Sequence, residues 1–263
     1  MTITELLESQ ASRLGDKPFI LLEDRTYTYA ELRENAARIA ANLRKRGLGP
    51  GDKIVLLMSN CLEFVYVFLG AGRIGAVAVP VNPTLKPDEI AIISANSDAE
   101  TLITIPEFIP LLPKLRELAP HLRRIFVLSG EADGAEPFSA LLEPVDEIPP
   151  IVATARDDAA LIYTSGTTGL PKGVILTHNN YIWNARMVKA RIDMGPTDRL
   201  FCVLPLFHVN AQVTSILAPM MAGADLFLMQ KFNPFHILPL IEKYRATVMS
   251  AVPTIYNIIC RMP

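Results

Sequence analysis

The chain has 263 residues, of which half are hydrophobic and 20% are charged, so a disordered protein is excluded and one large or two small packed domains are expected. The formal net charge of −2 gives no indication of binding to nucleic acid or to an anionic membrane surface. Three separated cysteines, Cys61, Cys202 and Cys260, exclude a disulfide framework or a zinc site and are interpreted as buried thiols of a cytoplasmic protein.

No stretch predicts a signal peptide or a transmembrane segment. The first ten residues carry acids and lack an apolar core. The longest uncharged stretch, 200–224, is interrupted by prolines, a glycine and polar residues. It is therefore interpreted as a strand, a loop and a buried helix.

The first part of the chain predicts a helix over 1–16 and a hairpin around Glu23 and Asp24. Thr28 and Glu31 have the spacing of a capping box, which begins a helix with one apolar face that Gly47 ends. A buried strand is expected over 53–59, and Asn60 is expected to cap the helix that follows it.

The segment from Gly70 to Gly75 reads GAGRIG and matches the dinucleotide-binding pattern G-x-G-x-x-G. In a dinucleotide fold the pattern follows a strand and opens a helix. Here residues 64–69 favour a helix and residues 76–81 favour a strand, so the order is reversed. We therefore expect these glycines to permit close helix packing and a helix exit. An NAD-dependent oxidoreductase is kept as an alternative that the element order opposes.

Helix and strand patterns then alternate to the end of the chain. The segment 130–158 is acidic and proline-rich, with one helical turn near 139–142, and is a candidate boundary between subdomains. The alternation predicts an α/β fold with parallel-rich sheets covered by helices on both faces. The expected helices are 87–95, 107–118, 178–191, 209–222, 234–244 and one beginning at Pro253; the expected strands are 101–105, 124–129, 159–163, 199–204, 225–229 and 247–252.

The stretch from Leu161 to His178 reads LIYTSGTTGLPKGVILTH and predicts a phosphate-binding loop. Glycines let successive backbone N–H groups converge on an anion, and hydroxyls add donors that rotate to meet phosphate oxygens. Lys172 is a mobile charge that could reach a terminal phosphate. The spacing fits neither a Walker loop nor a serine-hydrolase elbow. After the loop, His178, Asn179 and Asn180 are expected to cap a helix.

The eleven residues YTSGTTGLPKG closely resemble the phosphate-binding signature of the acyl-adenylate-forming (AMP-binding) enzymes, and the order of segments from about Thr28 onward is similar to their large N-terminal domain. The resemblance implies that a carboxylic acid attacks the α-phosphate of ATP, and that coenzyme A then displaces AMP. It also implies that the loop holds the β- and γ-phosphates with Mg²⁺, and that Thr164 is a metal ligand. By this match the phosphate-binding residues are Thr164, Ser165, Gly166, Thr167, Thr168, Gly169 and Lys172.

A second candidate site is His208, which follows a predicted strand, with Phe207 as an apolar wall. From the residues alone, a core histidine satisfied by its neighbours is favoured. The segment PLFHVNA nevertheless resembles the aromatic and histidine motif beside the acyl site of the same family, in its fatty-acid–CoA ligase-like branch. The resemblance implies that His208 borders the acyl carboxylate as a catalytic residue.

Residues 1–263 are expected to be a partial N-terminal AMP-binding domain, because the family's later segments and its C-terminal lid domain do not follow Pro263. The expected activity of the parent protein is that of an acyl-CoA synthetase, and this piece alone is expected to be inactive or nearly so. A nucleotide-binding module without catalysis is the alternative. A medium- or long-chain fatty acid is the first choice of substrate, because 200–229 is apolar; an aryl or small dicarboxylic acid and the oligomeric state stay open.

Overall fold

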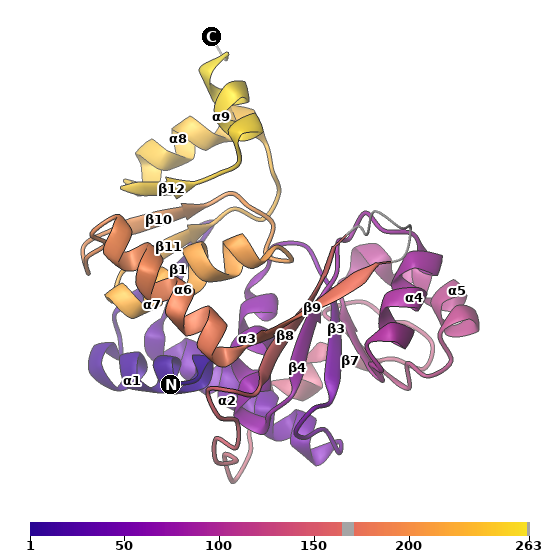
Figure 1. Cartoon of the computed structure of the whole chain (residues 1–263). Coiled ribbons are helices and arrows are strands. Elements are labelled where there is room, and N and C mark those ends of the chain that lie inside the picture. The colour runs from indigo at the N-terminus through magenta and orange to yellow at the C-terminus, as the bar shows by residue number, and fades with distance from the viewer. Residues whose placement is uncertain (165–170, 262–263) are drawn as a thin grey trace.

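Two β-sheets, each built mainly from parallel strands, form the frame of the computed structural model, which describes residues 1–164 and 171–261 (Figure 1). Only the pairs β8–β9 and β1–β2 are antiparallel among the strand pairs described. The α/β fold with parallel-rich sheets is therefore confirmed. In spatial order, the first sheet holds β7 (Glu136–Pro137), β6 (Arg124–Val127), β5 (Thr101–Thr104), β3 (Lys53–Leu57), β4 (Val77–Pro80), β8 (Asp158–Thr164) and β9 (Lys172–Thr177); the second holds β12 (Val248–Ser250), β10 (Arg199–Cys202), β11 (Asp225–Leu228), β1 (Pro18–Leu22) and β2 (Arg25–Thr28).

Helices cover the seven-stranded sheet on both faces, and strand β3 shows why its sequence is continuously apolar. Ile54 and Leu56 belong to a large core that also includes residues of both sheets. Val55 and Leu57 point to the opposite face, where α4 and α5 pack over a second core. The helices are α1 (Ile3–Leu14), α2 (Tyr29–Lys45), α3 (Leu62–Ala71), α4 (Pro87–Asn96), α5 (Leu112–Leu118), α6 (His178–Arg191), α7 (Ala218–Ala222), α8 (Pro234–Tyr244) and α9 (Pro253–Cys260).

Helix caps account for one confirmed prediction and two corrections. Thr28 and Glu31 form the predicted capping box of α2. Asn60 does not cap α3, because its side chain is hydrogen-bonded instead to backbone groups of the segment that follows β10 in the other sheet. Helix α6 is capped by Thr177, one residue earlier than expected, since the Thr177 hydroxyl accepts from the Asn180 N–H and the Asn180 side chain accepts from the Thr177 N–H.

The glycines from Gly70 to Gly75 serve helix packing and a helix exit, as predicted. A Cβ placed on Gly70 would lie 2.5 Å from the carbonyl oxygen of Ala36, because α3 crosses α2 at this point. Gly75 has a φ of 73°, a left-handed conformation that favours glycine, and it leads into β4. The order helix, glycines, strand is the reverse of a dinucleotide-binding unit.

The uncharged stretch 200–224 folds as strand, turn and helix, but its helix is irregular. Its residues Ala211–Leu217 form a π-helix, which continues as the short α7. Similarly, the expected helix over 107–118 is divided into a 3₁₀ segment, Pro106–Leu111, and α5, since Pro110 has no N–H to donate. Among the described residues, no helix has both the length and the apolar character needed to cross a bilayer.

Two side chains are more exposed than their sequence context suggested. Cys260 lies near the end of α9 and is exposed, whereas Cys61 and Cys202 are buried as predicted. Trp183, interpreted as a packing residue, is 57% exposed on α6, with the guanidinium of Arg186 over its ring.

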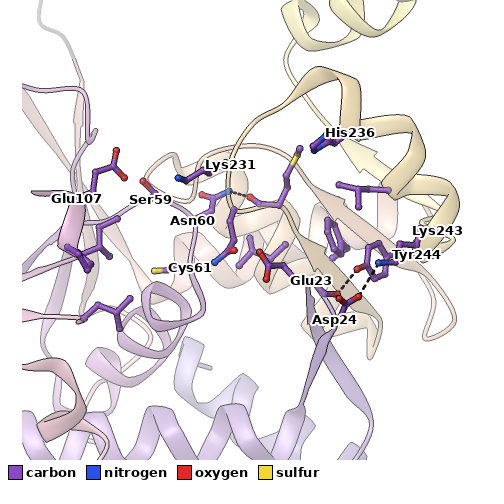
Figure 2. A pocket seen from close by; sticks show the side chains of 18 residues that line it. Glu23, Asp24, Ser59, Asn60, Cys61, Glu107, Lys231, His236, Lys243 and Tyr244 are labelled. Carbon is purple, nitrogen blue, oxygen red and sulfur yellow. Dashed lines mark hydrogen bonds and ion pairs between the residues drawn. The ribbon is translucent and has the colours of Figure 1, made fainter. Parts of the chain in front are cut away.

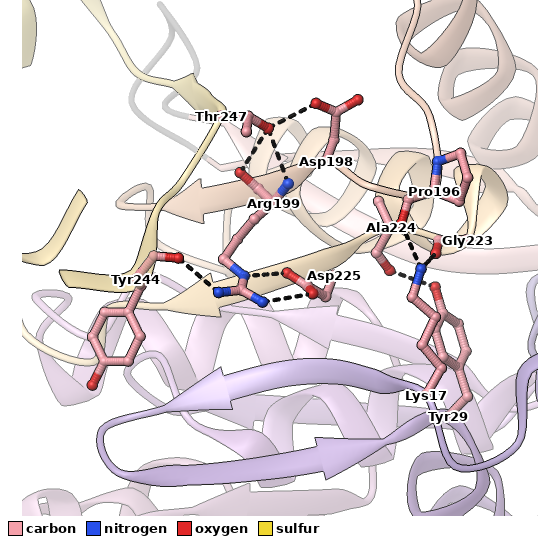
Figure 3. A network of polar contacts seen from close by, with 10 residues as sticks. All are labelled: Lys17, Tyr29, Pro196, Asp198, Arg199, Gly223, Ala224, Asp225, Tyr244 and Thr247. Carbon is pink, nitrogen blue, oxygen red and sulfur yellow. Dashed lines mark hydrogen bonds and ion pairs between the residues drawn. The ribbon is translucent and has the colours of Figure 1, made fainter. Parts of the chain in front are cut away.

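An ion pair links the first residues of two neighbouring strands in the five-stranded sheet (Figure 3). Arg199 of β10 donates to both carboxylate oxygens of Asp225 in β11, with a distance of 2.9 Å from Nη2 to Oδ2. The third donor of the same guanidinium meets the carbonyl oxygen of Tyr244 at the end of α8. This planar, multidentate arrangement fixes the end of α8 to the first residues of β10 and β11.

Candidate functional site

The hairpin of β8 and β9 positions both ends of the predicted phosphate loop. Thr164, the last residue of β8, is paired with Lys172, the first residue of β9. One pair further from the turn, Gly173 leaves room for the ring of Tyr163, because a Cβ on Gly173 would lie 3.1 Å from Tyr163 Cζ. Ser165, Gly166, Thr167, Thr168 and Gly169 lie outside the described residues, so their predicted roles stay predictions.

The carboxyl end of β8 opens into a cavity of about 690 Å³, here called the hairpin cavity. Strands β4 and β8 are parallel neighbours, so the residues that follow β4 reach the same edge as Thr164. Most of the cavity wall is apolar, which is typical of small-molecule sites. Its lining residues are Pro80, Val81, Asn82, Leu85, Glu89, Ile92, Ile93, Ile162, Tyr163, Thr164, Pro171, Phe207, His208 and Val209.

His208 enters the hairpin cavity from the other sheet, on the turn that follows β10. The turn is closed by a hydrogen bond from the His208 N–H to the carbonyl oxygen of Pro205. The ring of Phe207 lies beside the imidazole, with 4.1 Å between their centroids. Partial desolvation lowers the pKa of His208, so at neutral pH the ring is uncharged and offers one donor and one acceptor. Thr164 and His208, predicted separately, therefore line the same cavity.

Oxygen donors in the hairpin cavity fit a hard divalent cation such as Mg²⁺. Thr164 and Glu89 both line the cavity, and one oxygen of the Glu89 carboxylate already accepts from the N–H of Lys86 at the start of α4. Among the residues that the structure describes, no group of three or more His, Cys, Asp or Glu side chains gathers as a metal site. A cation here would therefore take most of its ligands from phosphate and water, which is usual for Mg²⁺.

Several cavity residues had been given no role in the sequence prediction. Tyr163 belongs to the recognised motif, and its hydroxyl donates to Asn96 Oδ1 at 2.6 Å, which joins the hairpin to the end of α4. Asn82 follows β4, and its side-chain oxygen accepts from the N–H of Thr84 at 3.0 Å. The rule that ligands meet the carboxyl ends of parallel strands would have identified Asn82, had the adjacency of β4 and β8 been known.

A second cavity, of about 810 Å³, lies between the two sheets (Figure 2) and is here called the inter-sheet cavity. It receives Ser59 and Asn60 after β3, Lys231 after β11, and His236 from α8. Its carboxylates are partly neutralised, since Asp24 pairs with Lys243 at 3.1 Å. None of the predicted site residues in the described part of the chain lines it.

Comparison with a family model matches residues 7–263 to the AMP-binding enzyme family. The chain is 36% identical over 262 residues to a 4-coumarate–CoA ligase of Pinus taeda, covering 97% of this chain and 48% of that protein. It is 35% identical over 260 residues to 4-coumarate–CoA ligase 2 of Solanum tuberosum, covering 96% of this chain and 47% of that protein. The chain thus spans about half the length of the curated relatives it matches.

Solved structures show the same fold. The inhibitor-bound N-terminal domain of FACL13 from Mycobacterium tuberculosis matches with a TM-score of 0.88 and 30% identity, covering 100% of this chain and 65% of that one. The anthranilate CoA ligase AuaEII, in complex with anthranoyl-AMP, matches with a TM-score of 0.93 and 26% identity, covering 98% of this chain and 51% of that one.

Proposed function

This chain belongs to the AMP-binding enzyme family, and on that premise we propose that it forms the part of an acyl-CoA synthetase that binds ATP and the acid to be activated. The observation that carries the proposal is the hairpin cavity, which is lined by both Thr164 of the phosphate motif and His208 of the acyl motif. The similarity to CoA ligases supports the ligase class.

In the proposed reaction, a carboxylate oxygen of the acid attacks the α-phosphorus of ATP, pyrophosphate leaves, and the thiol of coenzyme A later displaces AMP from the acyl-adenylate. Lys172 and the loop hydroxyls would hold the β- and γ-phosphates, and Thr164 would contribute an oxygen to Mg²⁺, which neutralises phosphate charge. The uncharged imidazole of His208 would donate to the carboxylate and orient it without forming a competing ion pair.

The acid is proposed to be an aryl or alkyl monocarboxylic acid, with a 4-coumarate-like acid tested first and fatty acids second. The apolar stretch 200–229 no longer argues for a fatty acid, since Leu200, Phe201 and Leu226 are at most 1% exposed and belong to the core. The sequence similarity to 4-coumarate–CoA ligases favours an aryl acid. Mg²⁺, coenzyme A and a cytoplasmic location stay parts of the proposal.

Binding of ATP tests the proposed phosphate site. Calorimetry with ATP and Mg²⁺ is expected to show binding that the Lys172→Ala variant weakens by roughly tenfold, because one charge-assisted contact to phosphate is lost. Lys45→Ala, which removes an exposed lysine at the end of α2, serves as the control and is expected to bind like the unmodified chain. Equal affinity in all three proteins would place the phosphates elsewhere.

Pyrophosphate exchange by residues 1–263 tests whether this chain only binds ATP or also catalyses the adenylation step. ATP binding without exchange is expected if catalysis needs groups that this chain does not contain. Full exchange activity would overturn the expectation that this piece is inactive and would assign the whole adenylation step to it.

A further inference from the structure

We propose that two buried amides, Asn60 and Gln212, are positioning residues that hold His208 in the hairpin cavity by clamping the backbone of Leu206 from both sides. This inference rests on the proposed function for the role of His208, but its geometry does not depend on it. The sequence did not predict that either amide belongs to the site. Neither amide is among the described residues that line the hairpin cavity.

Asn60 links the two sheets at the turn that carries His208. It lies between β3 and α3, is 8% exposed, and stands in the wall of the inter-sheet cavity (Figure 2). Its Oδ1 accepts from the N–H of Leu206 at 2.7 Å. Its Nδ2 donates to the carbonyl oxygens of Leu204 at 3.1 Å and Met229 at 2.9 Å. All three partners belong to segments that follow β10 and β11, so Asn60 fixes these segments to the seven-stranded sheet.

Gln212 completes the clamp from the π-helix. It is fully buried, and its Nε2 donates to the carbonyl oxygen of Leu206 at 2.8 Å. Its Oε1 accepts from the hydroxyl of Tyr181 on α6 at 2.5 Å, so the amide cannot rotate freely. The backbone N–H of the same residue donates to the carbonyl oxygen of His208 at 3.3 Å.

The clamp acts close to His208 because only Phe207 separates it from Leu206. Both backbone polar groups of Leu206 are bonded to buried side chains and not to a strand or helix neighbour. If either amide were removed, a buried backbone group would lose its partner, and the turn would move to find another. Among the described residues, the imidazole of His208 makes no hydrogen bond. Its position is therefore set by the backbone of the turn and by the contact with Phe207.

The test compares Asn60→Ala with Asn42→Ala. Asn42 is a matched control, because it is also buried and also donates to two carbonyl oxygens, those of Leu141 and Glu143. In Asn60→Ala we expect amide hydrogen exchange at Leu206 to become roughly tenfold faster, and carbethoxylation of His208 by diethyl pyrocarbonate to become several-fold faster. In Asn42→Ala both rates are expected to stay at the values of the unmodified chain, even if stability falls equally.

Two milder variants keep the test decisive if Asn60→Ala does not fold. Gln212→Met preserves side-chain length and removes the bond to Leu206, and Tyr181→Phe removes only the hydroxyl that holds the Gln212 side chain. Both are expected to accelerate His208 modification, Gln212→Met more than Tyr181→Phe. Folded clamp variants whose Leu206 exchange and His208 modification match those of the unmodified chain would overturn the inference.

Affinity for a non-reactive acyl sulfamoyl adenosine, measured in parallel, separates this inference from the proposed function. Faster His208 modification together with weaker binding in the clamp variants supports both. Faster modification when even the unmodified chain binds no analogue supports the clamp and contradicts the proposed function.

Discussion

Lowering the pH from 7 to 4 is expected to reduce the free energy of unfolding by about 3 kcal/mol through His178 alone. His178 is 1% exposed at the start of α6. Its Nδ1 accepts from the backbone N–H of Ile3 at 3.3 Å, so the proton of the neutral ring resides on Nε2. Among the described residues, Nε2 has no hydrogen-bond partner.

The sign of this pH effect follows from the difference between the pKa of His178 in the folded chain and its pKa in the unfolded chain. Burial lowers the pKa of His178 to about 4, and the nearby carboxylates of Asp157 and Glu5 only partly oppose this effect. In the unfolded chain the same group has a pKa of about 6.5. Between these two values the unfolded chain binds more protons than the folded one, so stability falls as the pH falls. The contribution is complete above pH 6.5 and is lost by about pH 4.

Urea unfolding at a series of pH values measures this effect. In the His178→Asn variant, the free energy of unfolding is expected to depend less on pH. The Asn Oδ1 can accept from the N–H of Ile3, and the Asn side chain does not take up a proton in this pH range. His236→Asn, on the exposed face of α8, is the control and is expected to retain the full slope. Parallel profiles for the unmodified chain and His178→Asn would contradict the account of a neutral, buried imidazole.

Replacement of Gly70 by valine is expected to destabilise the fold by about 3 kcal/mol or more. The atom that an added Cβ would meet, at 2.5 Å, is the carbonyl oxygen of Ala36. A backbone atom inside α2 cannot rotate away as a side chain can, so the two helices must separate. The gain in helix propensity over glycine, about 0.5 kcal/mol for valine, is too small to offset this separation.

The matched control is Gly49→Ala, because a Cβ on Gly49 would meet no atom within 4 Å. Urea unfolding should place Gly49→Ala within about 0.5 kcal/mol of the unmodified chain. If Gly70→Val were equally harmless, the interpretation of the GAGRIG segment as a helix contact would be wrong.

Local rules predicted the elements whose stabilising contacts are also local. The capping box of Thr28 and Glu31 needs only residues three positions apart, and the apolar run of β3 needs only two covered faces. Asn60 shows the limit of such rules. A lone asparagine before a helix is a reasonable cap, but its partners here are 144 and 169 residues further along the chain.

The candidate site was predictable in its parts and not in its assembly. Thr164 and His208 were identified from two motifs, yet only the packing of the two sheets shows that they share a cavity. Asn82 was missed because the adjacency of β4 and β8 is a property of the sheet order. Tyr163 lies within the recognised motif, but its hydrogen bond to Asn96 depends on how α4 packs against the hairpin. The burial of His178 was not predictable either, since it depends on the docking of α1, whose Ile3 lies 175 residues earlier in the chain.

The central claim is that the hairpin cavity binds an acyl-adenylate, and the most direct measurement is the NMR response of the ¹⁵N-labelled chain to a non-reactive acyl sulfamoyl adenosine. The account predicts saturable shifts at the amides of Tyr163, Thr164 and Asn82 and at the imidazole of His208. Shifts confined to the inter-sheet cavity, at Ser59 and Lys231, or no shifts at a saturating concentration, would contradict it.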